Sequence, residues 1–217
     1  MKTALIVQGG WGGHQPKEVA EILGALLREE RFAVEISDTL DSFLDEEKLC
    51  SLDLIVPIWT MGSITQEQLR PLLHAVRSGV GLAGCHGGMG DSFRNETEYQ
   101  FMVGGQWVAH PGNDGVTYQV HMTTISSSIT AGIEDFTVCS EQYYMHIDPA
   151  IQVLATTSFG DVEMPVVWTK TYGAGNVFYC SLGHQASIVA MPAVSTLMRR
   201  GMIFAAEASK RSESRDI

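Results

Sequence analysis

The N-terminal half of the chain alternates short apolar runs with segments of helical periodicity, which restricts the folds open to it. The apolar runs span residues 4–8, 32–36, 52–57 and 80–85, each the length of a buried strand. Helical spacing begins at Pro16, and Thr65 opens a capping-box pattern for a helix ending near Arg77. Strands that alternate with helices predict a parallel sheet covered on both faces.

The C-terminal half has a different pattern, in which strands follow one another. They are predicted over residues 116–124, 151–157, 165–171 and 177–182, the last two joined by a turn at 173–176. A helix over 191–207 closes the domain. We therefore expect one α/β domain over residues 1–209, with a mainly parallel central sheet and added β-hairpins, followed by a frayed polar tail at 210–217.

Charge and hydropathy exclude several function classes. The 217-residue chain has 25 acidic and 14 basic residues, and a field of that sign repels nucleic acid. Its apolar stretches are much shorter than the ~20 residues that a membrane helix needs. The first apolar run stops at Gly9, which leaves no full signal peptide. We expect a cytoplasmic protein with reduced cysteines, no membrane partner and no nucleic-acid partner.

Four of the seven histidines stand beside glycine or before a Pro-Gly pair: His14, His86, His110 and His184. Three of the four follow predicted strands directly or after a short glycine loop. Because ligands bind at the carboxyl edge of open α/β sheets, these histidines are candidates for one shared site. The other three histidines are interpreted as surface or structural residues.

The turn Gly84-Cys85-His86-Gly87-Gly88 follows a predicted strand and matches a nucleophile elbow with His86 at its centre. In this register Cys85 points back toward the sheet; the alternative register centres Cys85 instead. A second glycine-rich loop, residues 9–13, lacks the third glycine of a dinucleotide-binding loop because Gln15 takes that place. We expect no nucleotide cofactor.

Several segments together resemble the ThuA-like (trehalose-utilisation) family of the class I glutamine amidotransferase-like superfamily. The resemblance depends on their order and spacing along most of the chain. The segments are residues 81–88 with Asp91 after them, 104–111, 140–144, 164–168 and 173–179, leading to Leu182-Gly183-His184. The resemblance implies a flavodoxin-like, three-layer sandwich.

The chain departs from the amidotransferases of this superfamily, which use a Cys-His-Glu triad. His86 stands in the place of the cysteine, and Gln185-Ala186 follow His184 where the pattern has Pro-Glu. The resemblance therefore argues against glutamine hydrolysis. A residual amidohydrolase that uses Cys85 is one further hypothesis.

The four histidines and Glu141 have two alternative interpretations, as metal ligands or as catalytic acids and bases. His14, His86, His110 and His184, with Glu141, form a nitrogen and oxygen ligand set suited to zinc or another divalent metal. Alternatively, His86, Glu141 and His184 are catalytic acids and bases. In both cases Trp11, His14, Asp91 and His110 are the candidate substrate-binding residues, and Trp11, Trp59 and Trp107 offer flat apolar surfaces.

The family resemblance implies a role in the metabolism of trehalose-type disaccharides or their 3-keto derivatives. We expect an enzyme that isomerises a keto-sugar or eliminates a group from it, with a histidine or Glu141 as the base. The alternative is a non-catalytic protein that binds a sugar or another metabolite. We expect a homodimer because dimers are the commonest oligomers, although no sequence pattern indicates the interface.

Overall fold

A computed structural model describes residues 1–207, and its main feature is a large mixed sheet. Its strands are β1 (Thr3–Gly10), β2 (Ala33–Ser37), β3 (Leu54–Thr60), β4 (Gly81–Cys85), β6 (Val116–Met122), β7 (Phe136–Ser140), β9 (Gln152–Phe159), β10 (Val162–Tyr172) and β11 (Gly175–Cys180). Their spatial order is β2-β1-β3-β4-β11-β10-β9-β6-β7. Strands from β2 to β11 pair in parallel, and the rest pair antiparallel.

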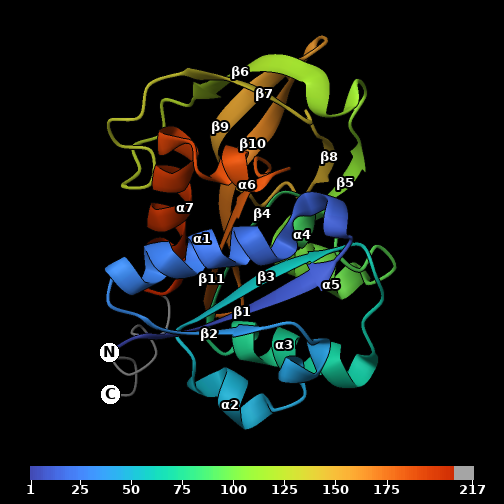
Figure 1. Cartoon of the computed structure of the whole chain (residues 1–217), viewed down its shortest axis with the longest axis vertical. Helices are drawn as coiled ribbons and strands as arrows, with labels where there is room; N and C mark the ends of the chain where they lie inside the picture. The colour runs from blue at the N-terminus through green and yellow to red at the C-terminus, as the bar shows by residue number, and fades with distance from the viewer. Residues whose placement is uncertain (208–217) are drawn as a thin grey trace.

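Helices cover both faces of the parallel part (Figure 1). They are α1 (Pro16–Glu29), α2 (Glu46–Ser51), α3 (Gln66–Arg77), α4 (His86–Gly90), α5 (Thr97–Val103), α6 (Ala186–Val189) and α7 (Pro192–Ala205), with short 3-10 turns η1 (Gly12–His14), η2 (Leu40–Phe43) and η3 (Asn113–Gly115).

Two hydrophobic cores explain this layering. Ala4 and Ile6 of β1 belong to the core that contains α1 and α7, whereas Leu5 and Val7 belong to the core that contains α3 and α5. Successive residues of a strand point to opposite faces, so one apolar run supplies both cores. The expected three-layer α/β sandwich with a mainly parallel sheet is confirmed.

Short sequence patterns predicted the first residues of helices α1 and α3 correctly. Thr65 Oγ1 accepts a hydrogen bond from the Gln68 backbone, and the Gln68 side chain accepts one from the Thr65 backbone, completing the predicted capping box of α3. Helix α1 begins at Pro16 as predicted. Strand β3, however, begins at Leu54 rather than at residue 52, because Leu52 is the C-cap of the unpredicted helix α2.

A small second sheet was not predicted. Strands β5 (Gly105–Ala109) and β8 (Tyr144–Ile147) pair antiparallel, and β5 packs beside α4. This places the residues before β8 next to the carboxyl ends of β4 and β11. The small sheet therefore forms one wall above the carboxyl edge of the main sheet.

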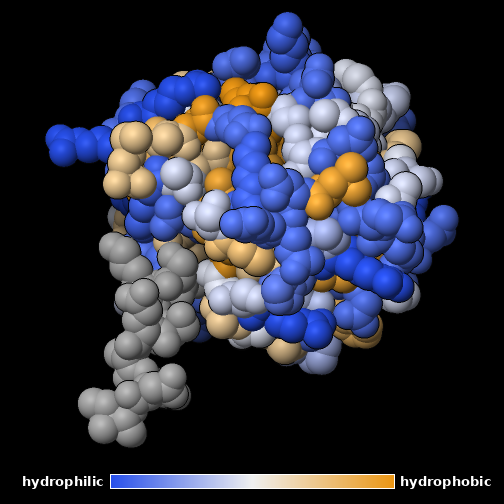
Figure 2. Space-filling model, turned by 90° about the horizontal axis from the view of Figure 1, so that it is seen from below, coloured by the Kyte–Doolittle hydropathy of each residue, from blue (hydrophilic) through white to orange (hydrophobic). Residues whose placement is uncertain are grey.

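The surface seen in Figure 2 is mostly polar, and its apolar side chains form small separate patches. No helix within residues 1–207 has both the length and the apolar character needed to cross a membrane. The tail expected at 210–217 lies outside the described residues.

Candidate metal centre

Three strands of the parallel part of the sheet, β1, β4 and β11, are each followed by a histidine at the same edge. His14 ends η1 just after β1, His86 directly follows β4, and His184 comes shortly after β11. The fourth member, Glu141, follows β7, and the Tyr118 hydroxyl fixes its backbone by donating to the Glu141 carbonyl at 2.9 Å. Side chains from both halves of the chain therefore meet at one place.

The backbone at His86 has the conformation of the predicted elbow. Its φ of 50° lies in the left-handed region, which non-glycine residues rarely adopt. A Cβ atom at Gly87 would lie 2.7 Å from Cε1 of His14, so only glycine lets the two histidines approach. Cys85, one residue earlier, packs into the core as expected, where burial raises the pKa of its thiol.

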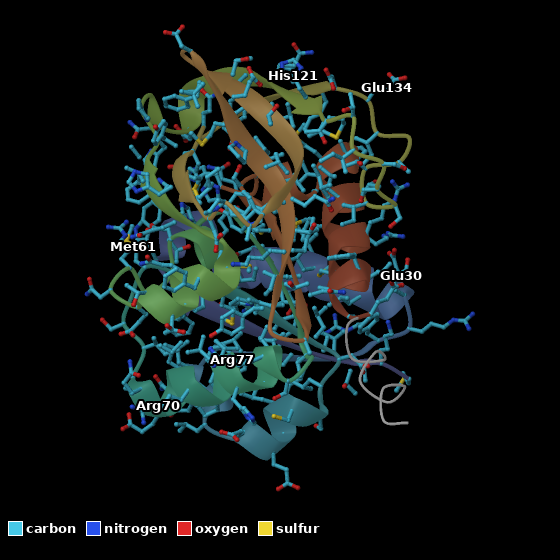
Figure 3. The ribbon with its side chains drawn as sticks, turned by 180° about the vertical axis from the view of Figure 1, so that it is seen from behind. Glu30, Met61, Arg70, Arg77, His121 and Glu134 are labelled. Carbon is cyan, nitrogen blue, oxygen red and sulfur yellow. The ribbon has the colours of Figure 1, made fainter. Side chains whose placement is uncertain are left out.

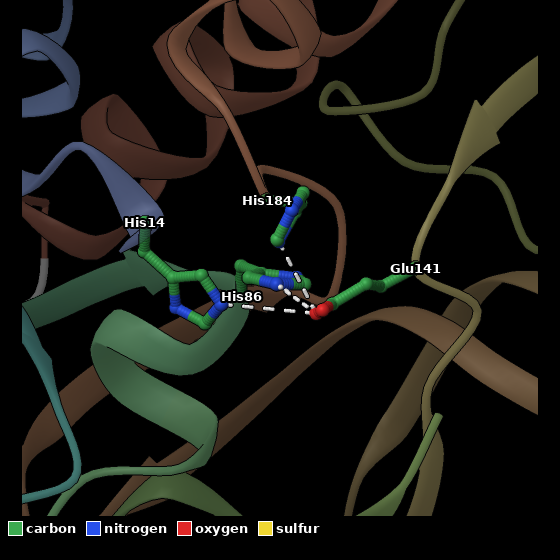
Figure 4. Close-up of side chains that lie close together, drawn as sticks. All are labelled: His14, His86, Glu141 and His184. Atoms are coloured by element: carbon green, nitrogen blue, oxygen red, sulfur yellow. Dashed lines mark hydrogen bonds and ion pairs between the residues drawn. The ribbon is translucent and has the colours of Figure 1, made fainter. Parts of the chain in front are cut away.

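The three histidine side chains converge on one carboxylate oxygen of Glu141 (Figure 4). Oε2 of Glu141 lies 3.0 Å from Nε2 of His86, 3.3 Å from Nδ1 of His184 and 3.7 Å from Nε2 of His14. All four residues are buried, and one ligand atom from each lies within 4.8 Å of the others. These four residues are called the His3Glu cluster below.

Hydrogen bonds outside the His3Glu cluster orient two of its rings. His86 Nδ1 donates to the Ser181 carbonyl at 2.8 Å, which leaves the lone pair of Nε2 facing the cluster. His14 Nδ1 lies 2.8 Å from Oγ1 of Thr60, so its Nε2 also faces inward. His184 Nδ1 is buried without a hydrogen-bond partner among the described residues. Outer partners of this kind orient histidines at metal sites.

The protonation states of His86 and Glu141 leave two hydrogen-bond acceptors facing each other in the cluster. Burial lowers the pKa of His86 to about 4, although Glu141 opposes the shift, so its imidazole is neutral at pH 7. A carboxylate oxygen thus faces nitrogen lone pairs, an arrangement that a divalent cation would stabilise.

A cavity of about 300 Å³ opens onto the cluster. Its lining consists of Trp11, His14, Met61, Asp91, Arg94, Trp107, His110, Asn113, Asp114, Glu141, Tyr143 and His184. Met61 lies at the edge of the molecule, in the loop that follows β3 (Figure 3). The lining thus combines the aromatic side chains of Trp11, Trp107 and Tyr143 with three members of the His3Glu cluster.

Most of the residues predicted from the sequence reach this site. His14, Glu141 and His184 line the cavity, and His86 belongs to the His3Glu cluster. His110 lies beside the cluster, with Nδ1 3.7 Å from Oε1 of Glu141, the carboxylate oxygen that faces away from the other histidines. It is outside the group of four.

The remaining predicted residues and several unpredicted ones complete the wall. Asp91 lines the cavity, but both of its oxygens accept hydrogen bonds from Arg94, whose guanidinium lies 4.6 Å from the centre of the Trp107 ring. Trp59 packs against Gly9 and Gly62 instead. The sequence reasoning did not assign Arg94 or Tyr143, although Tyr143 stands in segment 140–144, one of the segments that carried the family resemblance.

Comparison with known proteins identifies the family. The family model described as "Trehalose utilisation", ThuA, matches residues 3–205. The chain belongs to the ThuA family. Comparison with curated proteins gave no match.

Solved structures of ThuA-like proteins share the fold. A ThuA-like protein from Parabacteroides merdae is 20% identical, with a TM-score of 0.76 over 95% of this chain and 90% of its own. Another from Bacteroides uniformis is 14% identical, with a TM-score of 0.73 over 94% and 91%. A protein of Salmonella typhimurium described as cytoplasmic is 15% identical, with a TM-score of 0.71 over 94% and 99%. ThuA membership supports a carbohydrate-related role, and the His3Glu cluster could hold a metal ion.

Proposed function

We propose that this ThuA-family chain is a metal-dependent enzyme that moves a proton on an uncharged keto-sugar, leading to isomerisation or elimination. The observation that carries the proposal is the buried His3Glu cluster at the base of a cavity with aromatic walls. The family description, trehalose utilisation, supports a disaccharide or its 3-keto derivative as the substrate.

The cluster supplies a ligand set suited to zinc. Nε2 of His14, Nε2 of His86, Nδ1 of His184 and Oε2 of Glu141 would hold the ion. Three nitrogens and one oxygen suit zinc better than they suit magnesium or calcium, which prefer oxygen ligands. A divalent ion there would polarise a substrate carbonyl and make the neighbouring C–H more acidic.

His110 and the second oxygen of Glu141 lie beside the cluster and are available for proton transfer. His110 is partly exposed to the cavity, and its Nδ1 has no hydrogen-bond partner among the described residues. Imidazole is the usual base at neutral pH. We assign His110 the removal of the proton next to the carbonyl, with Oε1 of Glu141 as its polar partner.

The charges around the cavity favour an uncharged substrate. Arg94 is the one lysine or arginine among the described lining residues, and Asp91 already pairs with it through two hydrogen bonds. Asp114 and Glu141 add negative charge. A sugar phosphate would therefore lack a free lysine or arginine partner, whereas Trp11 and Trp107 offer apolar faces to a neutral sugar ring.

The test is incubation of the metal-loaded protein with a 3-keto-disaccharide in D2O, followed by NMR and mass spectrometry. We expect deuterium at the carbon next to the carbonyl, and loss of exchange after chelation and dialysis. Saturable binding without exchange or product would instead favour the non-catalytic sugar-binding alternative. Full activity in metal-free protein would contradict the role of the ion.

We further propose that the protein works in the cytoplasm as a homodimer, with a small-molecule substrate and without nucleic acid. The net charge of −11 supports the last point. Sedimentation of the full chain measures the oligomeric state.

A further inference from the structure

Tyr143 touches the His3Glu cluster without being a member of it. Its side chain is buried and lines the cavity. Its ring stacks on that of His86, with centroids 4.1 Å apart and planes inclined by 27°. Its hydroxyl lies 2.8 Å from Nε2 of His86. Tyr143 therefore faces both the cluster and the space where a ligand would bind.

The Tyr143 hydroxyl and a metal ion would compete for the same lone pair. Because Nδ1 of His86 donates to the Ser181 carbonyl, Nε2 of the neutral ring has a single lone pair and accepts from Tyr143. A cation in the cluster needs that lone pair. On metal binding, the hydroxyl loses its acceptor while it stays in the cavity wall.

A buried hydroxyl without a partner is unfavourable, so it needs a new acceptor. The cavity is the open side of Tyr143, since the ring is covered by His86 and has Trp107 and His110 near its edge and face. An oxygen atom of a ligand bound beside the cluster would supply the acceptor. Two other nearby tyrosines already donate to backbone carbonyls of the cluster, Tyr179 to that of His86 and Tyr118 to that of Glu141, both at 2.9 Å, and are structural contacts.

We propose that Tyr143 is a further catalytic residue, whose hydroxyl donates a hydrogen bond to the substrate oxygen that becomes negative when the neighbouring proton leaves. This proposal rests on the proposed function. The hydroxyl keeps its own proton throughout and stabilises the developing charge, as donors of an oxyanion hole do.

The proposal and a purely supporting role, in which Tyr143 only orients His86, predict different effects of Tyr143→Phe on zinc affinity. A residue that supports a ligand strengthens metal binding, and its loss weakens affinity about 10-fold to 100-fold. A residue that competes with the metal has the opposite effect. Tyr143→Phe should leave zinc affinity unchanged or raise it by up to about tenfold, the value of one hydrogen bond.

The experiment compares wild type, Tyr143→Phe and the control Tyr144→Phe. Tyr144 is the next residue, packs edge-on against Phe159 and is not part of the cavity lining. Zinc affinity is measured on metal-free protein. Binding of acetohydroxamate, a chelating mimic of an enediolate, is measured on cobalt-loaded protein by visible absorption. Turnover of the keto-sugar is measured last.

For Tyr143→Phe we expect acetohydroxamate affinity to fall at least about tenfold and kcat to fall about 100-fold to 1000-fold with little change in KM. Tyr144→Phe should match wild type. Weaker zinc binding with unchanged acetohydroxamate affinity would overturn the proposal and make Tyr143 a support for His86. Behaviour identical to Tyr144→Phe, or a wild type that binds no metal, would also overturn it.

The two proposals fail in different ways. If wild type binds metal and acetohydroxamate but leaves every keto-sugar unchanged, the proposed function fails while the acetohydroxamate comparison still decides the role of Tyr143. Should Tyr143→Phe not fold, NMR of wild type with labelled histidine gives the answer. The coupling between the Tyr143 hydroxyl proton and Nε2 of His86 must vanish on metal loading, and its persistence would overturn the proposal.

Discussion

Oε2 of Glu141 lies 3.0 Å from Nε2 of His86, although the only N–H proton of the neutral His86 ring is on the opposite nitrogen, Nδ1, which donates to the Ser181 carbonyl. Two electron-rich atoms thus face each other in a buried site. Ion pairing would require a protonated imidazole, which burial disfavours by lowering the pKa of His86. A shared cation satisfies both atoms without that proton.

The stability of the metal-free protein should depend on pH through His86. Its pKa falls from an ordinary 6.5 to about 4 on folding, so between these values the unfolded chain binds more protons and stability rises with pH. Lowering the pH from 7 to 4.5 should cost about 2–3 kcal/mol from this residue.

Urea unfolding across that pH range measures this effect. The variant His86→Asn should lose most of the slope between pH 4.5 and 6.5, whereas His74→Asn, at an exposed position of α3, should keep it. An equal slope in wild type and His86→Asn would contradict the assignment of a neutral, buried imidazole.

Thr60 should influence metal affinity without touching the ion. Its Oγ1 lies 2.8 Å from Nδ1 of His14 and fixes the orientation of that ring. Thr60→Val keeps the shape and removes the hydroxyl, so zinc affinity should fall about tenfold or more. Thr117→Val, at an exposed position of β6, is the matched control and should bind like wild type. Unchanged affinity in Thr60→Val would show that His14 is not oriented by this bond.

Asp91 should determine whether the cavity accepts a negative charge. Its carboxylate accepts two hydrogen bonds from the Arg94 guanidinium. Asp91→Asn removes the charge of that carboxylate and leaves Arg94 without an ion-pair partner in the cavity wall. We expect the variant to bind a sugar phosphate at least about tenfold more tightly than wild type does, since a charge-assisted bond becomes available. Asp148→Asn, which removes a pair with Lys170 outside this cavity, should not change that affinity. Tight binding of the sugar phosphate by wild type would contradict the preference for uncharged substrates.

The sequence predicted those parts of the site that depend on local patterns. The elbow at His86 and the capping box at Thr65 follow from a few neighbouring residues, and the parallel strands bring His14, His86 and His184 to one edge. The contribution of Glu141 came from the family resemblance, because no spacing relates it to the elbow.

The parts that were missed depend on contacts between distant segments. Strands β5 and β8 are only five and four residues long and pair across a long separation, so neither has a clear period of its own. Tyr143 lies next to β8 and reaches His86 across a long sequence separation, and Arg94, besides its local pair with Asp91, lies over the ring of Trp107. Their roles could be recognised only when the tertiary structure placed them around the cavity.

Zinc titration of metal-free protein, with elemental analysis of the loaded form, tests the central claim most directly. Wild type should bind about one ion per chain, with X-ray absorption showing nitrogen and oxygen ligands near 2.0–2.1 Å. His184→Ala should weaken binding at least about 100-fold, more than the loss of an outer partner, and His74→Ala should not weaken it. A wild type that binds no stoichiometric metal, or a His184→Ala variant that binds as tightly as wild type, would contradict the assignment of the His3Glu cluster as a metal centre.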